Sequence, residues 1–519
     1  MPGPTDKERR EELSNRDIEA ARTFHQVTAH SFTSVRAMPH TLDWDNRPLP
    51  YKIYPDAGVV VLPRDLELSG VSALTAVRGE VPIDLKTPVD LETITRLLFC
   101  ANGLTRSLRA GGQPYHFRAA PSAGALYPIE IYLAATQVEG LEAGLYHFSP
   151  ADLRLRGLRR GDWRMHLVRS AGMRSSILEA RALLVLSAIF WRSAWKYRAR
   201  AYRYCFWDTG TILANLLAAA NAEGLQAEVV TSFTDSQVEA LIGVGGEREG
   251  IMCIVALGRR APAPLKSPEL GPLELETIPL SATEVSYPDL VRIHGESRLA
   301  SSEEAREIVE ARIEPLRLAT SGGEARPCPL GDEAGMGLGD TILRRGSTRV
   351  FAREAIDAAE LATIMAASSS HAQIDFPRLT QTYLVVHAVS GLEPGAYYYR
   401  RETGAFELFK GGDFRAQAGY LCLEQPLGAD CSAMIVYMGD LERILASLGN
   451  RGYRDAHLEA GLLGGRAYLA AYALERGATG LTFYDEDTSK FFEPHAAGMS
   501  PLLIIAVGVP GQHGSSHAG

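Results

Sequence analysis

The chain has 519 residues, of which 46% are hydrophobic and 22% are charged. This length predicts more than one domain, and the composition is typical of a soluble globular protein with a sizeable core. The formal net charge is −9 and the basic residues are dispersed along the chain. This charge distribution argues against a nucleic-acid partner.

The cysteines and the first residues indicate the compartment. The six cysteines show neither a CxxC pair nor a spacing with histidine that suits zinc, so we expect no metal site and a reducing compartment. Residues 1–12 lack the apolar segment of a secretory signal, and no apolar run is long enough to span a membrane. We therefore expect a cytoplasmic protein without a membrane partner.

The chain begins with a stretch of mixed character. We predict that residues 1–75 form an N-terminal arm, with a charged helix within residues 6–28. Alternating apolar residues predict short strands at 51–54 and 58–62.

Residues 263–340 are predicted to connect two larger parts. Prolines are frequent between positions 262 and 300, which excludes a long helix there. The connector then separates a first domain, residues 76–262, from a second domain, residues 341–510. Residues 511–519 are expected to be a flexible tail.

These two domains are repeats of one another. Residues 140–146, Gly-Leu-Glu-Ala-Gly-Leu-Tyr, resemble residues 391–397, Gly-Leu-Glu-Pro-Gly-Ala-Tyr, which lie 251 positions later. The same spacing pairs Tyr132 with Tyr383, Asp162 with Asp413, Tyr202 and Arg203 with Tyr453 and Arg454, and Gly210 with Gly461. Several matches at one spacing indicate a duplicated α+β domain.

A turn at residues 121–128, Pro-Ser-Ala-Gly-Ala-Leu-Tyr-Pro, separates a predicted helix at 91–101 from a predicted strand at 129–134. Small side chains and glycine let the backbone approach a ligand closely. The alternative is a plain connecting loop. The equivalent residues of the second half, 372–375, read Ala-Gln-Ile-Asp, so this turn exists once.

The second half has a segment that suits a phosphate group. Residues 344–351 read Arg-Arg-Gly-Ser-Thr-Arg-Val-Phe, and we expect the arginines and the serine to converge at a helix start and bind an anion. The first half has Arg-Gly-Glu-Val-Pro at 78–82 instead, which removes the hydroxyl and the second arginine. A similar segment at 106–109, Arg-Ser-Leu-Arg, is expected to be a solvated loop.

Both segments resemble those of the nitroreductase superfamily of FMN enzymes, and more narrowly its SagB-type dehydrogenases of azoline, thiazole and oxazole biosynthesis. The resemblance implies two fused α/β/α sandwich repeats that form a pseudo-dimer within one chain. It also implies one FMN per chain, because each half has kept a different part of the site. The cofactor-binding residues carried over are Arg345, Ser347 and Arg349 for the phosphate, and Pro121, Ser122, Ala123, Gly124, Thr479, Gly480 and Leu481 for the flavin ring.

The predicted catalytic pair is Lys196 and Tyr197, which resembles the Lys-Tyr pair of the azoline dehydrogenases. The lysine either lowers the pKa of the phenol or loses its own proton through desolvation. The alternative is a solvated lysine beside a packed tyrosine. The spacing of 251 places Ser447 and Leu448 opposite the pair. Asp208 is expected to be a helix cap or an ion-pair partner.

Three functions follow from these expectations. The first is dehydrogenation of an azoline-type ring in a modified peptide or a natural product by an FMN-dependent oxidoreductase. The second is an NAD(P)H-dependent nitro, quinone or ene reductase, and the third is a flavin-binding pseudo-enzyme without catalysis. The implied partners are a small-molecule or peptide substrate and other biosynthetic enzymes, while a higher oligomer stays open.

Overall fold

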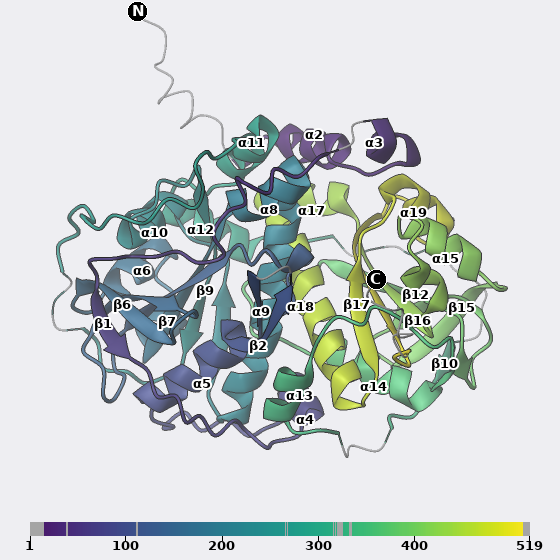
Figure 1. The fold of residues 1–519 in the computed structure, drawn as a ribbon, viewed down its shortest axis with the longest axis horizontal. Helices are drawn as coiled ribbons and strands as arrows, with labels where there is room; N and C mark the ends of the chain where they lie inside the picture. Colours follow the sequence, from purple (N-terminus) through teal and green to yellow (C-terminus); the bar gives the residue numbers. More distant parts are fainter. Residues whose placement is uncertain are drawn as a thin grey trace, which may run out of the picture.

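The structure, a computed structural model, describes residues 15–37, 40–110, 113–264, 266, 268–314, 316, 318, 325–331 and 335–511. Two seven-stranded sheets flank a central pair of long helices, α9 (Ala201–Ala222) and α18 (Arg451–Ala473). In Figure 1 one sheet lies on the left, the other on the right, and these two helices run between them.

The first half contains an antiparallel sheet with the strand order β1-β6-β5-β4-β7-β9-β8. Its strands are β1 (Gly58–Val61), β4 (Ile129–Ala135), β5 (Gly144–Ser149), β6 (Arg154–Arg160), β7 (Ala182–Ile189), β8 (Ala227–Val230) and β9 (Glu249–Leu257). The helices besides α9 are α4 (Ala73–Arg78), α5 (Leu91–Asn102), α6 (Arg164–Ser170), α7 (Ser175–Leu178), α8 (Phe190–Tyr197) and α10 (Asp235–Ile242). Smaller elements are the hairpin β2 (Leu104–Ala110) and β3 (Gln113–Arg118), and the 3-10 turns η1 (Ala123–Ala125) and η2 (Arg198–Arg200).

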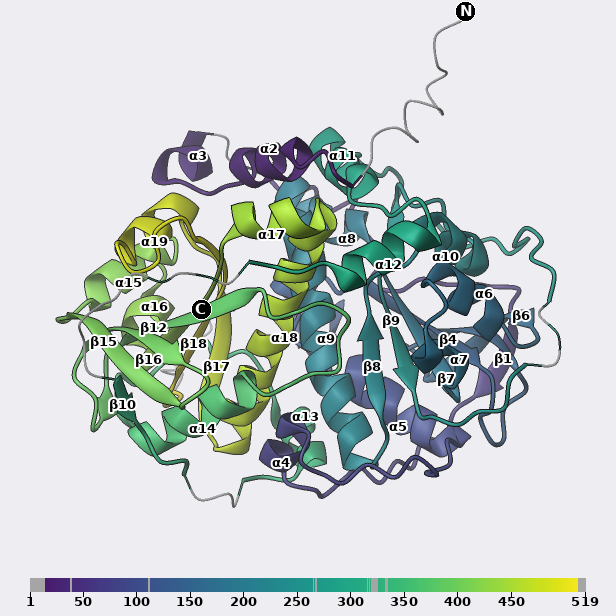
Figure 2. The same ribbon diagram turned by 180° about the vertical axis from the view of Figure 1, so that it is seen from behind.

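The second half repeats this arrangement with the strand order β10-β15-β14-β12-β16-β18-β17. Its strands are β10 (Ala325–Pro327), β12 (Thr380–Val386), β14 (Gly395–Arg400), β15 (Ala405–Gly411), β16 (Ala433–Gly439), β17 (Gly477–Leu481) and β18 (Ser500–Gly508), and a separate pair is β11 (Ile356–Asp357) with β13 (Val389–Ser390). The helices besides α18 are α13 (Leu338–Arg344), α14 (Ala358–Ser368), α15 (Arg415–Leu421), α16 (Pro426–Asp430), α17 (Leu441–Leu448) and α19 (Asp485–Phe491). The α+β fold of the two halves therefore follows one plan, seen from behind in Figure 2.

Equivalent helices start with equivalent residues. Asp90 precedes α5 and accepts a hydrogen bond from the Thr93 N–H at 2.7 Å. Asp357 precedes α14 and forms a capping box with Glu360. Such caps satisfy the free N–H groups of a first helical turn, so the same local rule begins this helix in both halves.

The two long helices cross where each has a glycine. A Cβ atom on Gly210 would lie 2.3 Å from the Leu462 nitrogen, and one on Gly461 would lie 2.5 Å from the Trp207 carbonyl oxygen. Only glycine allows the backbones to approach so closely. The pair of glycines found at the repeat spacing therefore forms the contact between the halves.

Buried ion pairs join the halves at the first turns of these helices. Arg203 of α9 binds Asp485 of the second half at 2.6 Å, and Arg454 of α18 binds Asp235 of the first half at 2.9 Å. All four side chains are buried. Because a buried charge without its partner is costly, these pairs specify how one half sits on the other.

The N-terminal arm lies across both halves. Its helices are α2 (Glu19–Val27) and α3 (Phe32–Ala37), and its strand β1 extends the first sheet. The predicted helix within 6–28 is present from Glu19, while residues 1–14 lie outside the described residues. The predicted strand at 51–54 is wrong, because this segment is anchored through the Lys52 ammonium, 2.6 Å from Glu249, rather than through strand pairing.

The connector contains only short elements among its described residues. They are α11 (Pro288–Glu296), α12 (Ser302–Glu310) and β10, which forms the edge of the second sheet. Of the predicted tail only Gly511 is described. Within the described part of the chain, no helix has the length and apolar character needed to cross a membrane.

Candidate active site

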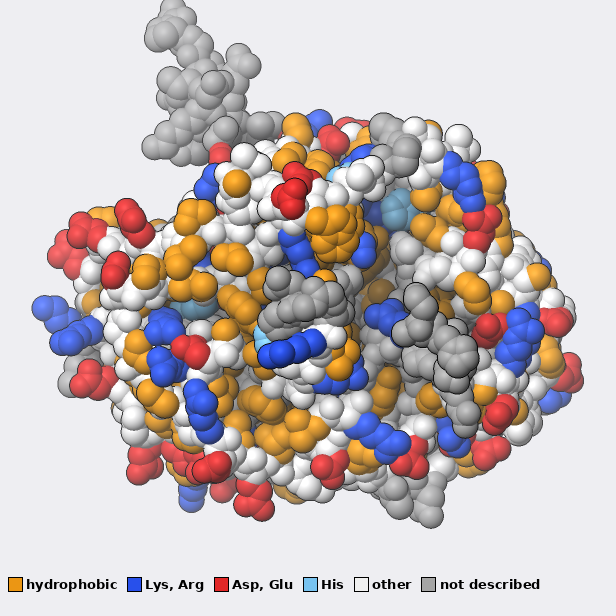
Figure 3. All heavy atoms as spheres, in the orientation of Figure 1, with side chains coloured by type: hydrophobic (Ala, Val, Ile, Leu, Met, Phe, Trp, Pro, Cys, Tyr) orange, Lys and Arg blue, Asp and Glu red, His pale blue; other side chains and the backbone are white. Residues whose placement is uncertain are grey.

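A cavity of about 470 Å³ lies between the two halves. Its lining residues come from both: Pro121, Ser122, Ala123, Gly124, Ala125, Lys196, Tyr197, Tyr204, Trp207, Asp208 and Thr211 of the first half, and Ser347, Arg349, Gln425, Tyr468, Thr479, Gly480, Leu481, Thr482, Leu503 and Ile505 of the second. Figure 3 shows that this face is hollowed near its centre, with basic side chains around the hollow. The cavity brings together every predicted site residue except Arg345.

The turn at 121–128 forms one wall. Gly124 has φ +64°, and a Cβ atom there would lie 2.7 Å from the Tyr197 hydroxyl and 3.4 Å from the Lys196 Nζ atom. A side chain at this position would be strained and would occupy the space beside the predicted catalytic pair. The turn is therefore shaped so that backbone, and not side chain, faces the cavity.

Asp208 holds this turn in place. Its carboxylate accepts hydrogen bonds from the Ser122 Oγ atom at 2.5 Å and from the Ala123 N–H at 3.0 Å. Burial raises the pKa of Asp208 to about 7, and these two donors only partly oppose the shift. The expectation of a helix cap or an ion-pair partner is wrong, because Asp208 lies within α9 and its partners are a loop hydroxyl and a loop amide.

Lys196 and Tyr197 end α8 and point into the same cavity. The Lys196 ammonium lies 5.3 Å from the centroid of the Tyr197 ring, which meets the Tyr204 ring edge to face at 4.4 Å. The pKa of Lys196 is lowered by desolvation and by nearby Arg349. Burial raises the pKa of Tyr197 well above its ordinary value. The expectation that the lysine lowers the pKa of the Tyr197 phenol is therefore wrong. The other expectation, that desolvation lowers the pKa of Lys196, agrees with the structure.

The predicted phosphate segment differs from expectation in two respects. It follows α13 as an extended loop and does not open a helix, which starts only at Ala358. The loop pairs instead with β17, since the Thr348 N–H donates to the Ala478 carbonyl at 2.9 Å. Arg345 is buried and donates to the carbonyl oxygens of Ala119 and Arg118 at 2.8 and 2.9 Å. Its guanidinium therefore joins the two halves, whereas Ser347 and Arg349 reach the cavity.

The opposite wall is β17. Thr479, Gly480 and Leu481 line the cavity along this edge strand. The Gly480 N–H donates to the Tyr468 hydroxyl at 2.5 Å. This wall presents small or apolar groups to the cavity, as a flat aromatic ring requires.

Several cavity residues carried no signal that pointed to the site. They are Tyr204, Trp207, Thr211, Gln425, Tyr468, Thr482, Leu503 and Ile505. Most lie on α9, α18 or β18, where an inward-facing residue cannot be told from a core residue in the sequence. A comparison of the repeats at all positions facing the predicted turn could have identified Tyr204, because its counterpart is Asp455.

The equivalent position on the other side of the molecule is closed. The spacing of 251 relates Ala123 to Ile374 and Gly480 to Val229. Ala123 and Gly480 both line the cavity, whereas Ile374 and Val229 form a parallel β-bridge, and the Val229 N–H donates to the Gln373 carbonyl at 2.8 Å. Backbone pairing occupies the space that is open on the first side.

Acidic side chains stabilise this closed counterpart of the cavity through hydrogen bonds and ion pairs. Asp375, the counterpart of Gly124, accepts hydrogen bonds from the Thr231 N–H at 2.8 Å and the Ser232 N–H at 3.0 Å. Glu228, the counterpart of Thr479, forms ion pairs with Arg174 at 3.1 Å and Arg259 at 3.3 Å. The basic groups of this side are thus bound to protein carboxylates.

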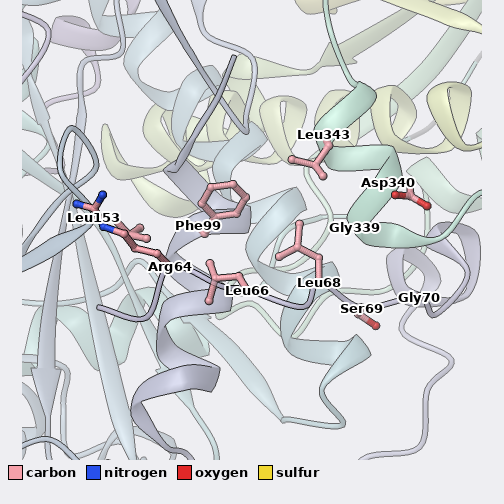
Figure 4. Close-up of a pocket in the computed structure, with 10 residues that line it drawn as sticks. All are labelled: Arg64, Leu66, Leu68, Ser69, Gly70, Phe99, Leu153, Gly339, Asp340 and Leu343. Carbon is pink, nitrogen blue, oxygen red and sulfur yellow. The ribbon is translucent and has the colours of Figure 1, made fainter. Parts of the chain in front are cut away.

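Another cavity, of about 330 Å³, lies between the arm and α13. Figure 4 shows Leu66, Leu68, Phe99 and Leu343 gathered around it. It contains none of the predicted site residues. No group of His, Cys, Asp or Glu side chains in the described ranges could hold a metal ion.

Comparison with known proteins finds similarity to one family. Residues 85–259 match the nitroreductase family. A solved structure from Anabaena variabilis, whose description assigns it provisionally to the nitroreductases, covers 95% of this chain, and this chain covers 99% of it, with a TM-score of 0.76 and 25% identity. The likeness thus extends over both halves.

Two relatives are named as processing proteins. The chain is 31% identical over 170 residues to the trifolitoxin-processing protein TfxB of Rhizobium leguminosarum bv. trifolii. The aligned residues make up 32% of this chain and 46% of the relative. It is 32% identical over 123 residues to the microcin B17-processing protein McbC of Escherichia coli, 23% of this chain and 45% of the relative. The chain thus spans about half the length of each. The fold, the family match over residues 85–259 and these relatives together make the chain similar to the nitroreductase family.

Proposed function

We propose that this chain is an FMN-dependent dehydrogenase of azoline-type rings in a modified peptide or a natural product. The observation that carries the proposal is the meeting of Lys196 and Tyr197 with a glycine turn and a cationic loop in one cavity between the halves. The peptide-processing relatives support a peptide-derived substrate. Other biosynthetic enzymes are then expected partners, and a cytoplasmic location is part of the proposal.

The cavity fits FMN. Its volume of about 470 Å³ lies within the range of about 300–1,000 Å³ that is usual for cofactor sites. Arg349 and Ser347 would hold the phosphate, because a guanidinium and a hydroxyl are the donors that a phosphate accepts. Residues 121–124 and 479–481 would flank the ring. When bound, FMN supplies a hydride acceptor that oxygen can reoxidise.

One FMN is proposed per chain. Its two walls come from different halves, which supports a pseudo-dimer of two nitroreductase-like domains within one chain. The contact of α9 with α18 supports the same arrangement, since family members usually bury such helices between subunits. The closed counterpart has lost both its glycine turn and its free cations, so it would not hold a second FMN.

Lys196 is the proposed base. Its side chain is exposed at the cavity, and its lowered pKa gives a larger fraction of neutral amine near neutral pH than a lysine with an ordinary pKa has. The Nζ atom would take the proton from the ring carbon of the substrate. Tyr197 stays protonated because its pKa is raised, so its hydroxyl would donate a hydrogen bond and orient the substrate.

Replacing the catalytic pair tests this assignment. We expect Lys196→Ala to lower the turnover of a thiazoline substrate by about 10²-fold or more, and Tyr197→Phe to lower it less, with the spectrum of bound flavin unchanged in both. Ser447→Ala, at the counterpart of Lys196, is the matched control. Full activity in the double variant would contradict the proposal.

The alternatives make different predictions in the same assay. An NAD(P)H-dependent nitro, quinone or ene reductase would consume nicotinamide in the presence of a nitro compound or quinone and would leave the thiazoline unchanged. A non-catalytic pseudo-enzyme would bind FMN and turn over neither substrate.

A further inference from the structure

A groove of about 510 Å³ adjoins the proposed active site. It shares Gly124, Ala125 and Lys196 with the cavity, so the two spaces meet at the proposed base. We call it the arm groove, because one side is formed by the N-terminal arm; its lining residues are Leu42, Trp44, Arg47, Pro48, Leu49, Pro50, Tyr51, Tyr115, His116, Phe117, Arg118, Gly124, Ala125, Leu126, Tyr127, Trp195 and Lys196. It offers a path from solvent to Lys196.

The arm groove is built from rings and positive charge. It has three lysine or arginine residues, and none of the described residues that line it is aspartate or glutamate, although the whole chain has a net charge of −9. A cavity of one charge sign attracts ligands of the opposite sign. The groove therefore favours an anionic ligand with an apolar or aromatic body.

Arg118 and Arg47 have different roles in this lining. Arg118 is buried, and its guanidinium donates to the carbonyl oxygens of Pro50 and Ile129. Arg47 is half-buried and forms no ion pair with any other described residue. The hydrogen bonds of Arg118 are thus used within the protein, and Arg47 is the cation available to a ligand.

Aromatic rings hold the Arg47 guanidinium. It lies 5.9 Å from the Trp44 ring centroid and 5.4 Å from the Tyr115 ring centroid. Trp44 is 61% exposed and meets the Trp195 ring edge to face at 5.2 Å. Contact with rings leaves the edges of a guanidinium free for a bidentate carboxylate.

Hydrogen bonds fix the arm against α8, which carries Lys196. The Trp195 Nε1 atom donates to the Asp43 carbonyl at 2.8 Å, and His40 Nε2 lies 2.9 Å from the Trp195 carbonyl. The wall that carries Trp44 and Arg47 is thus joined to the helix turn that carries the base. A ligand bound by Arg47 would be held in a defined place relative to Lys196.

We infer that the arm groove is the substrate site, and that it selects an azoline substrate bearing a carboxylate group, which Arg47 binds. The inference rests on the proposed function for the reacting ring. It assigns to Arg47 and Trp44 the choice of substrate, while Lys196 acts on the ring itself.

Binding of an inert product analogue tests the inference without catalysis. The probes are 2-phenylthiazole-4-carboxylic acid and its methyl ester, titrated into the FMN-loaded protein by calorimetry. We expect the acid to bind about 10- to 100-fold more tightly than the ester, since a charge-assisted hydrogen bond is gained. Added salt should weaken the binding of the acid only.

Variants separate charge from shape. Arg47→Ala should remove the preference for the acid and leave the affinity for the ester unchanged, which also shows that the groove is intact. Arg47→Lys should retain part of the preference. Trp44→Ala should weaken both probes and the acid more than the ester, because the Trp44 ring also positions the Arg47 guanidinium. Arg248→Ala, an exposed arginine outside the groove, is the control of equal charge and should behave as the parent protein.

Three outcomes would overturn the inference. They are equal affinities for acid and ester, equal loss of both probes in Arg47→Ala, and tight Arg47-dependent binding of 2′,5′-ADP, which would indicate a nicotinamide nucleotide instead. The proposed function can fail separately: discrimination between acid and ester without oxidation of the corresponding thiazoline would reject dehydrogenation alone. Oxidation without discrimination would reject the inference alone.

Discussion

The open cavity and its closed counterpart occupy equivalent positions in one fold. On the open side Ala123 and Gly480 line the cavity, and on the closed side Ile374 and Val229 are joined by backbone pairing. The strand order around both is the same. A few side chains therefore decide whether this fold has a cavity, which shows that a functional site resides in local residues rather than in the architecture.

The comparison also shows that equivalent positions have a structural role in one half. In the closed counterpart, Asp375 and Glu228 bind the amides and arginines that surround them. Polar groups that could hold a cofactor on one side hold the protein together on the other. The predictions below test this division of roles, from the largest expected effect to the smallest.

Substitution of Gly124 should strongly weaken cofactor binding. The parent protein should bind one FMN per chain, and Gly124→Val should bind it at least about 100-fold more weakly, because the side chain is strained at this φ and enters the cavity. Equilibrium titration of FMN measures both. Ala372→Val in the closed turn is the control and should keep full binding; two FMN per chain would refute the assignment of a single site.

The two arginines of the predicted phosphate segment should behave differently. Arg349→Ala should weaken FMN binding about 10- to 150-fold, from the loss of about 1.5–3 kcal/mol of a charge-assisted contact. Arg345→Ala should mainly lower the melting temperature, because Arg345 binds two carbonyl groups of the other half. Arg174→Ala, which removes a cation of the closed counterpart, should not change the affinity; a loss of FMN in this variant would reverse the roles of the two sides.

Asp375 should contribute to the free energy of unfolding and not to FMN binding. Asp375→Ala leaves two buried amides without acceptors, which should cost about 1–3 kcal/mol of unfolding free energy. Urea denaturation measures this loss, and Asp65→Ala at an exposed site is the control. An unchanged unfolding free energy together with weaker FMN binding would contradict the structural role.

Asp208 should make stability depend on pH. Its pKa in the folded protein is about 7, above that of an unfolded aspartate, so the folded state retains the proton longer. This contribution is complete at low pH and is lost as the pH rises from about 4 to about 7. Asp208→Asn should flatten that part of the profile of melting temperature against pH; a steeper decline in the variant would mean the opposite shift.

Much of the site could be recognised in the sequence because its signals are local. A Pro-Ser-Ala-Gly turn, an Arg-x-Ser-x-Arg segment and a Lys-Tyr pair each lie within a few residues, and the structure brings members of all three into one cavity. The spacing of 251 positions between the repeats could also be read directly from matching residues in the sequence. The segment at 106–109 was predicted less well: it lies in strand β2, which pairs antiparallel with β3.

The sequence by itself therefore determined the repeated motifs, the glycine turn and the asymmetry between the halves, since these depend on residue type and spacing. Only the tertiary structure decided that Arg345 binds carbonyl groups while Arg349 faces the cavity, that Asp208 holds the turn, and that the arm forms a groove beside Lys196. Each of these depends on contacts between residues that lie far apart in the chain. Such contacts are selected by burial, charge and shape in the folded molecule, which no local pattern specifies.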